Sequence, residues 1–144
     1  MKKGIIFEIH KSMREERDSG VTNKKKRYLV IGNPIKHSLS PKLHNYWFKN
    51  NDINAVYDKK KINKSDIKSI ISKIRNEKIS GINVTVPFKK SVIPFLDKLT
   101  PDADEVQSVN TIYKENNIII GANTDILAFE KSINSYKINN KKIL

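Results

Sequence analysis

The chain has 144 residues, with 28 Lys and Arg against 15 Asp and Glu, a formal net charge of +13, and no cysteine. This length suits one domain, and the lack of cysteine excludes disulfides, a thiol nucleophile and a cysteine-ligated metal site. The longest apolar run, around Ile118 to Ala122, is far below the roughly 18 residues that span a bilayer. Charged residues follow the initial Met too closely for a secretory signal, so we expect a soluble, cytoplasmic protein.

The strong positive charge raises the question of a nucleic-acid partner, but its distribution argues against one. Lysine supplies 24 of the 28 basic residues and is spread along the whole chain, and the aromatic residues do not alternate with it. Recognition of bases and phosphates relies more on the arginine fork. We therefore expect no nucleic-acid partner and no membrane, and we expect the charge to attract small anionic ligands.

The first half of the chain predicts a leader followed by alternating strands and helices. Residues 1–27 are polar and basic and predict a loosely ordered leader. Residues 28–32 form a short apolar run closed by a Gly-Asn-Pro turn signal, which predicts a buried strand. Ser40, followed by Pro41, is the expected N-cap of a helix. Three apolar residues recur at helical spacing in that helix: Leu43, Tyr46 and Trp47.

The remaining elements continue the alternation. Residues 55–62 predict a second strand, and Ser65 is the expected cap of an amphipathic helix with isoleucines at 67, 70, 71 and 74. Gly81 opens a third strand, and Thr100 before Pro101 predicts a short helix. The last predicted elements are listed in chain order: a hairpin of residues 109–114 and 118–122, and a helix capped by Thr124 that carries Ile126, Phe129, Ile133 and Tyr136.

Strands separated by helices predict an α/β fold, with a mostly parallel sheet covered by helices on both faces (three layers, α/β/α) and a final hairpin and helix. Residues 139–144 read as a loop that feeds an apolar strand of only two residues. We therefore expect a leader at 1–27, a domain at 28–138, and the start of a further domain at 139–144. The five glycines lie far apart, so the sequence contains no glycine-rich phosphate loop.

The third strand carries the most informative pattern. Because side chains alternate along a strand, Ile82, Val84 and Val86 should lie on one face, and Asn83 and Thr85 on the other. A buried amide and hydroxyl need partners, which a ligand rich in hydroxyls could supply. Lys89 follows just beyond the strand, at the edge where open α/β sheets bind ligands. Asn83 and Thr85 could instead bond to backbone groups, and Lys89 could be one more solvated lysine.

Further polar clusters lie at comparable junctions. Ser38 and Ser40, at the entrance of a helix, can surround a carboxylate with hydroxyl and backbone donors, although Ser40 could equally be a plain N-cap. Asn110 lies in the short polar cluster Val109-Asn110-Thr111, and Asp125 falls in the first turn of the last helix, where the helix dipole favours its ionised form. The histidines show no ligand-like spacing, so we expect no metal site.

Taken together, four segments resemble the shikimate dehydrogenase family: residues 32–41, residues 83–89, Val-Asn-Thr at 109–111 and Asn-Thr-Asp at 123–125. The resemblance runs from about Tyr28 to Leu144 and matches the amino-terminal, substrate-binding domain of that family. It implies reversible reduction of 3-dehydroshikimate to shikimate by NADPH, in the biosynthesis of aromatic amino acids through chorismate. It also implies that NADP is bound by a carboxyl-terminal Rossmann domain that this chain lacks, and that a homodimer is possible.

The resemblance also implies a role for individual residues. Ser38 and Ser40 would hold the substrate carboxylate, and four residues would bind ring hydroxyls: Asn83, Thr85, Asn110 and Asp125. Lys89 and Asp125 would form the catalytic pair, in which Lys89 donates the proton to the carbonyl oxygen as hydride arrives.

The sequence departs from the family pattern at three places. Ala122 replaces an Asp and Ile126 replaces a Gly around the catalytic acid, and the Gly that usually precedes Val-Asn-Thr is replaced in Gln107-Ser108. These changes bear on local backbone geometry and on the choice between shikimate and quinate, which stays open here, as does the choice between NAD and NADP. Two other functions also stay open: a shikimate-binding module without redox activity, and a basic nucleic-acid-binding domain.

Overall fold

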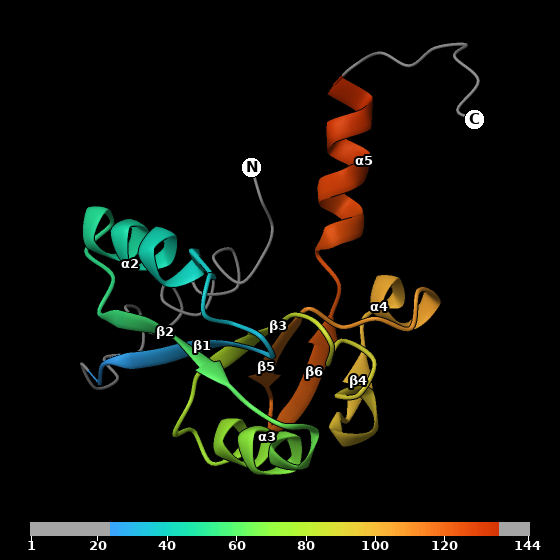
Figure 1. The fold of residues 1–144 in the computed structure, drawn as a ribbon, viewed down its shortest axis with the longest axis horizontal. Coiled ribbons are helices and arrows are strands. Elements are labelled where there is room, and N and C mark those ends of the chain that lie inside the picture. Colours follow the sequence, from blue (N-terminus) through green and yellow to red (C-terminus); the bar gives the residue numbers. More distant parts are fainter. Residues whose placement is uncertain (1–23, 136–144) are drawn as a thin grey trace.

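A six-stranded sheet runs through residues 24–135, the part of the chain that the computed structural model describes (Figure 1). Its strands are, in chain order, β1 (Lys26–Gly32), β2 (Ala55–Lys61), β3 (Gly81–Val84), β4 (Lys98–Leu99), β5 (Thr111–Glu115) and β6 (Ile118–Ala122). Across the sheet they follow the order β2-β1-β3-β5-β6-β4. Only the two pairs that include β5 are antiparallel, so β5 runs against the other five strands. The mostly parallel sheet predicted from the sequence is confirmed.

Helices cover both faces of this sheet. They are α2 (Ser40–Asn50), α3 (Ile67–Arg75), α4 (Pro101–Glu105) and α5 (Asp125–Ser135), with short 3-10 turns at Lys64–Asp66 and Ile93–Phe95. In Figure 1, α2 and α3 lie on opposite sides of the strands. Strand β1 shows the same division, because Tyr28 and Val30 belong to the apolar cluster that includes Phe48 of α2, whereas Leu29 and Ile31 belong to the cluster under α3. The predicted three-layer arrangement is therefore confirmed.

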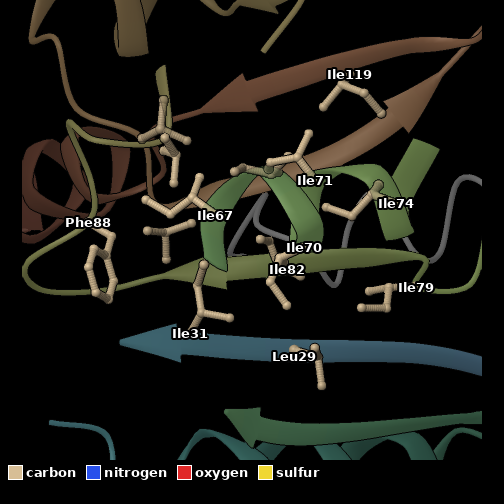
Figure 2. Close-up of a cluster of buried hydrophobic side chains, with 14 of the residues drawn as sticks. Leu29, Ile31, Ile67, Ile70, Ile71, Ile74, Ile79, Ile82, Phe88 and Ile119 are labelled. Atoms are coloured by element: carbon tan, nitrogen blue, oxygen red, sulfur yellow. The ribbon is translucent and has the colours of Figure 1, made fainter. Parts of the chain in front are cut away.

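The larger apolar cluster lies between α3 and the sheet. Figure 2 shows the α3 isoleucines packed over Ile31 and Ile82 in the centre of the sheet. The four isoleucines predicted to form the apolar face of this helix are all buried: Ile67, Ile70, Ile71 and Ile74. Burial of each such side chain contributes about 1.5–3 kcal/mol, so this face is a main source of stability for the domain.

The hairpin of β5 and β6 forms as predicted, with a two-residue turn. Asn116 and Asn117 both have positive φ angles, of 49° and 64°. A tight hairpin turn with two positive φ angles matches the twist of the strands, and Asn tolerates that conformation better than most residues. The turn brings Thr111 opposite Ala122, so the start of β5 and the end of β6 lie side by side.

The apolar stripe predicted on the helix after Ser40 is wrong. Leu43 and Tyr46 are 53% and 63% exposed, and the residue of α2 that enters the core is Phe48. The sheet-facing side of α2 also carries Asn45, whose side-chain Nδ2 donates to the Tyr57 carbonyl at 2.7 Å while its Oδ1 accepts from the Tyr57 N–H at 2.9 Å. This helix is therefore oriented by a pair of hydrogen bonds to the edge strand β2 and not by a continuous apolar face.

Several strand boundaries also differ from the prediction, and β5 covers Thr111–Glu115 rather than residues 109–114. Strand β1 begins at Lys26, two residues before the predicted start, because Lys26 and Arg27 pair with Ala55 and Val56 of β2. Strand β3 ends at Val84, and Val86, expected on the buried face, is 63% exposed. The predicted leader up to residue 23 and the predicted strand at 139–144 lie outside the described residues.

Thr100 is the N-cap residue of α4 as predicted, whereas α2 and α3 start near the predicted places but with different capping groups. Ser40 is the first residue of α2, and its N–H donates to Oγ of Ser38 at 3.4 Å. The turn before α3 begins at Lys64 rather than being capped by Ser65, and Asp66 accepts from the N–H of Asn63 at 2.7 Å. Competition among neighbouring Ser, Asn and Asp side chains for the same free N–H groups explains these shifts.

The last helix is only partly covered by the rest of the fold. In Figure 1, α5 extends away from the sheet. Phe129, expected on its apolar face, is 66% exposed, whereas Ile126 and Ile133 are half-buried; Tyr136 lies outside the described residues. Among residues 24–135, no helix combines the length and the apolar character that crossing a bilayer requires.

The packing of α2 on β2 predicts a dependence of stability on pH. The His44 ring stacks on the ring of Tyr57, with centroids 4.0 Å apart, and its Nδ1 lies 2.8 Å from the Ser40 carbonyl. Burial lowers the pKa of His44 from its usual 6.5, and the Ser40 carbonyl opposes this only in part. Between the folded pKa and 6.5 the unfolded chain binds more protons, so the free energy of unfolding decreases as pH falls through that range. We expect urea denaturation to show that the free energy of unfolding decreases less between pH 8 and pH 5.5 in His44→Phe than in the parent chain. An equal or larger loss in His44→Phe would contradict this.

Candidate active site

The predicted site residues gather at one edge of the sheet because of the strand directions. Strands β1, β3 and β6 are parallel to one another, so their carboxyl ends lie at the same edge, and the antiparallel strand β5 begins there. The loop after β1 carries the two serines, the loop after β3 carries Thr85 and Lys89, and Asp125 follows β6. Asn110 directly precedes β5. The edge is the one at which open α/β sheets bind ligands.

Lys89 and Asp125 form an ion pair at this edge of the sheet. Lys89 Nζ lies 2.7 Å from Asp125 Oδ2, although the two residues are 36 positions apart in the chain. The Lys89 carbonyl accepts from the Val109 N–H at 2.9 Å, which fixes the loop that carries the ammonium. Asp125 opens α5, where the helix dipole stabilises a carboxylate. The side chains are 32% and 59% exposed, so the pair can be reached by a ligand.

Asn110 holds the carboxylate from the other side. Its Nδ2 donates to Asp125 Oδ1 at 2.8 Å, and its Oδ1 accepts from the backbone N–H of Thr124 at 3.1 Å. A backbone N–H can only donate, so the oxygen of the amide must face Thr124 and the nitrogen must face Asp125. Asn110 is 8% exposed. Its hydrogen bonds fix the plane of the Asp125 carboxylate and leave the second carboxylate oxygen for Lys89.

Asn83 joins the same network through the start of β5. Its Nδ2 donates to the Asn110 carbonyl at 3.2 Å and to Thr111 Oγ1 at 3.1 Å. Its Oδ1 accepts from the Tyr57 hydroxyl at 2.6 Å. The prediction that Asn83 points away from Ile82 and Val84 and needs polar partners is therefore confirmed, with protein groups supplying those partners.

Ser38, Ser40 and Thr85 form a second group at the same edge. The N–H of Thr85 donates to the Ile31 carbonyl at 3.0 Å, and a Cβ at Gly32 would lie 2.5 Å from Thr85 Cγ2. Glycine at position 32 therefore leaves room for the Thr85 side chain at the end of β1. Within residues 24–135, the structure shows no hydrogen bond from these three side chains to Lys89 or Asp125.

A lysine from the edge strand fixes the serine loop. Lys59 Nζ donates to the carbonyls of Lys36 and Ser38, the latter at 3.4 Å. The loop that carries the two serines is therefore tied to β2 by a cation. This adds positive charge beside the hydroxyl groups, as expected for a site that accepts an anion.

Sequence reasoning missed three residues that touch the predicted site: Tyr57, Thr111 and Thr124. Thr111 lay within a polar cluster but received no role, Thr124 was assigned only as a helix cap, and Tyr57 was assigned only to a strand. Thr124 donates its N–H to Asn110, and its Oγ1 accepts from Asn110 Nδ2 at 3.0 Å. Tyr57 and Thr111 are 0% and 2% exposed. Only the burial of these polar side chains could have identified them, and a sequence pattern indicates such burial weakly.

The three departures from the family pattern are accommodated locally. Gln107 adopts a φ of 49°, the region that favours glycine, and its Nε2 donates to the Asp104 carbonyl at 2.6 Å. Ala122 keeps its backbone place, since its carbonyl accepts from the Asn110 N–H at 3.0 Å, and Ile126 is half-buried. The backbone that carries Asn110 is thus held without the usual glycine. Among the described residues, no group of three or more His, Asp or Glu side chains could hold a metal ion.

Comparison with known proteins agrees with this geometry. A family model described as the shikimate dehydrogenase substrate binding domain matches residues 30–112. A shikimate dehydrogenase (NADP(+)) of Pelagibacter ubique is 60% identical over 83% of this chain and 46% of its own length. The enzyme of the same name from Streptococcus pneumoniae strain P1031 is 43% identical over 79% of this chain and 40% of its own length. The chain thus spans less than half the length of these curated relatives.

Solved structures give the same result. The shikimate dehydrogenase of Aquifex aeolicus superposes with a TM-score of 0.74 and 40% identity, over 85% of this chain and 46% of that one. A Listeria monocytogenes shikimate 5-dehydrogenase, solved with shikimate and NAD, gives a TM-score of 0.75 and 28% identity, over 83% and 41% of the two chains. The edge-of-sheet site, the family match across more than half of the residues and these relatives lead to one assignment: the chain belongs to the shikimate dehydrogenase family and comprises its substrate-binding domain.

Proposed function

We propose that this chain is the substrate-binding and catalytic part of an NADP-dependent shikimate dehydrogenase of the cytoplasm, which reversibly reduces 3-dehydroshikimate to shikimate in aromatic amino acid biosynthesis. The observation that carries the proposal is the Lys89–Asp125 ion pair of 2.7 Å, formed between the loop after β3 and the first residue of α5 at the ligand-binding edge of the sheet. Asn110 holds the carboxylate of that pair in a fixed orientation. An ammonium held in place by a fixed carboxylate can act as a general acid and transfer a proton to a carbonyl oxygen.

In the proposed reaction Lys89 acts at the ketone oxygen. As the carbonyl carbon gains hydride, negative charge develops on the oxygen, and the Lys89 ammonium stabilises that charge and then transfers one proton to it. The product is a secondary alcohol and a neutral amine, and in the reverse direction the amine removes the hydroxyl proton. Asp125 fixes the place of the Lys89 ammonium through the contact of 2.7 Å.

The remaining polar groups would bind the rest of the substrate. Ser38 and Ser40 would donate to the carboxylate, beside the backbone groups that Lys59 ties down. Three further residues would bind ring hydroxyls: Asn83, Thr85 and Asn110. Both amide hydrogens of Asn110 are engaged, by Asp125 and by the Thr124 hydroxyl. A substrate hydroxyl that binds Asn110 Nδ2 would therefore replace the Thr124 hydroxyl.

The nicotinamide cofactor is proposed to bind elsewhere. Its pyrophosphate needs a glycine-rich turn at a helix N-terminus, and none of the loops at the carboxyl edge of this sheet has one: the glycine that ends β1 is followed by Asn33 and Pro34. We therefore assign no residue of 24–135 to the cofactor and expect NADP(H), the source of the hydride, to be held by a domain that follows this one.

Titration calorimetry of this chain with shikimate tests the proposal. We expect saturable binding, and a loss of roughly tenfold or more in Ser38→Ala, because a hydrogen bond to a charged group typically contributes about 1.5–3 kcal/mol. Ser72→Ala is the matched control, since Ser72 is exposed and lies in the second half of α3, which leads to the amino end of β3 at the other edge of the sheet. The absence of shikimate binding, or equal losses in the two variants, would refute the proposed site.

A further inference from the structure

A directed chain of hydrogen bonds connects the core under α2 with the ion pair. The Tyr57 hydroxyl donates to Asn83 Oδ1 at 2.6 Å, and Asn83 Nδ2 donates to Thr111 Oγ1 at 3.1 Å. The Thr111 hydroxyl then donates to Asn110 Oδ1 at 3.1 Å, and Asn110 Nδ2 donates to Asp125 Oδ1 at 2.8 Å. Each hydroxyl has one hydrogen to give, so Tyr57 and Thr111 each donate to one amide oxygen of the chain.

The direction is fixed at both ends by groups that have one role. The Asn110 carbonyl, which can only accept, receives Asn83 Nδ2 at 3.2 Å and so turns the amide oxygen of Asn83 towards Tyr57. At the other end, the Asp125 carboxylate can only accept when ionised. Burial raises the pKa of Tyr57 above its usual value of 10.0, so its hydroxyl keeps its proton and remains a donor.

Tyr57 itself is held on three sides. Its backbone N–H and carbonyl are both bonded to the side chain of Asn45, at 2.9 and 2.7 Å. Its ring stacks on His44 at a centroid distance of 4.0 Å and an interplanar angle of 13°. The ring is fully buried. The hydroxyl therefore has a fixed position, set by α2, from which it can orient the amide of Asn83.

From this geometry we propose that Tyr57 and Thr111 are positioning residues of the shikimate site, which act through Asn83 and Asn110. With both hydrogens of its Nδ2 engaged, Asn83 presents only the second lone pair of Oδ1 to a ligand. It therefore binds as an acceptor and selects a ligand hydroxyl that donates. Thr111 joins the two amides, since its Oγ1 accepts from Asn83 Nδ2 and donates to Asn110 Oδ1, and so it helps to hold Asn110 in the orientation that the Thr124 N–H requires. The part of this inference that concerns ligand binding rests on the function proposed above, whereas the orientation of the amides does not.

The hydrogen-bond chain is tested first without any ligand. In Tyr57→Phe, the NMR signals of the Asn83 side-chain amide should shift, and in Thr111→Val those of Asn110 should shift, while Thr111→Ser, which keeps the hydroxyl, should restore them. Tyr46→Phe is the matched control for the loss of a hydroxyl, because Tyr46 is 63% exposed on the opposite side of α2. Unchanged amide signals in folded Tyr57→Phe and Thr111→Val would overturn the proposal.

The second test uses shikimate and its three monodeoxy analogues, each of which lacks one ring hydroxyl. Tyr57→Phe should bind shikimate about tenfold more weakly, the size expected for one misoriented hydrogen bond. For the analogue that lacks the hydroxyl bound by Asn83, the parent chain and Tyr57→Phe should bind equally. Equal weakening for all four ligands would show a merely structural role and overturn the proposal. If the parent chain binds none of them, the proposed function fails, and the NMR result alone decides whether Tyr57 and Thr111 orient the amides.

Discussion

Replacement of Lys89 by alanine should lower turnover by about 10²- to 10⁴-fold, the usual contribution of a positioned general acid. The measurement needs a cofactor-binding part, so we suggest joining this chain to the carboxyl-terminal part of the Pelagibacter ubique relative, which is 60% identical to it over 122 residues. Shikimate oxidation is then followed by the absorbance of NADPH. Without the ammonium, an alkoxide-like oxygen has no cation beside it, so the chemical step slows.

The same variant should retain most of its affinity for shikimate, because the proposed carboxylate and hydroxyl contacts come from other residues. Lys90→Ala is a closely matched control: it removes the same kind of side chain one position further along, from an exposed residue. We expect turnover of the control to stay within about twofold of the parent enzyme, since exposed substitutions usually have small effects. Turnover of Lys89→Ala equal to that of Lys90→Ala would contradict the assignment of Lys89 as the acid.

Replacement of Ile82 by alanine should lower the free energy of unfolding by about 2–5 kcal/mol, the range for removal of a large aliphatic side chain from a core. Ile82 is fully buried in β3, a central strand, and packs in the cluster under α3 (Figure 2). The loss combines the transfer of apolar surface to water with the cavity that remains. Because domains of this size have only about 5–15 kcal/mol of stability, the variant should be close to unfolding at 37 °C.

Ile118→Ala provides the comparison for this experiment. Ile118 is also in a strand of the sheet but is 42% exposed, so its truncation should cost less than about 1 kcal/mol by urea denaturation. Similar losses in the two variants would show that the core is not centred between α3 and the middle strands.

Most of the fold could be predicted from the sequence because its residue patterns are compatible with only one kind of secondary structure. The isoleucines of α3 lie at helical spacing and all enter the core, and two asparagines between apolar strands gave the hairpin turn. The grouping of Lys89, Asn110 and Asp125 could be anticipated because parallel strands bring their carboxyl ends to one edge. Strand direction, together with the resemblance to the family, therefore placed these distant polar motifs at one edge.

The errors arose where a side chain's surroundings come from segments distant in sequence. Tyr46 and Phe48 are both aromatic and two residues apart, and only the position of the edge strand β2 determines which of them is buried. Tyr57 looked like an ordinary strand residue, because its hydroxyl partner Asn83 is 26 positions away. Periodicity describes which residues share a face, but it does not show which face meets a neighbour or how buried polar groups pair.

The exposure of the Lys89–Asp125 pair to solvent affects how strongly its ammonium can stabilise a developing negative charge. Opposite charges about 4 Å apart attract by roughly 1 kcal/mol in bulk water and by about 4 kcal/mol at the effective dielectric constant of about 20 typical near a protein surface. An ammonium surrounded by mobile water stabilises a developing alkoxide weakly, because the solvent must reorganise with every charge movement. As the proposed acid, Lys89 would therefore act at full strength only when substrate and a covering surface have replaced that water, so substrate capture and chemistry would make different demands on the same edge of the sheet.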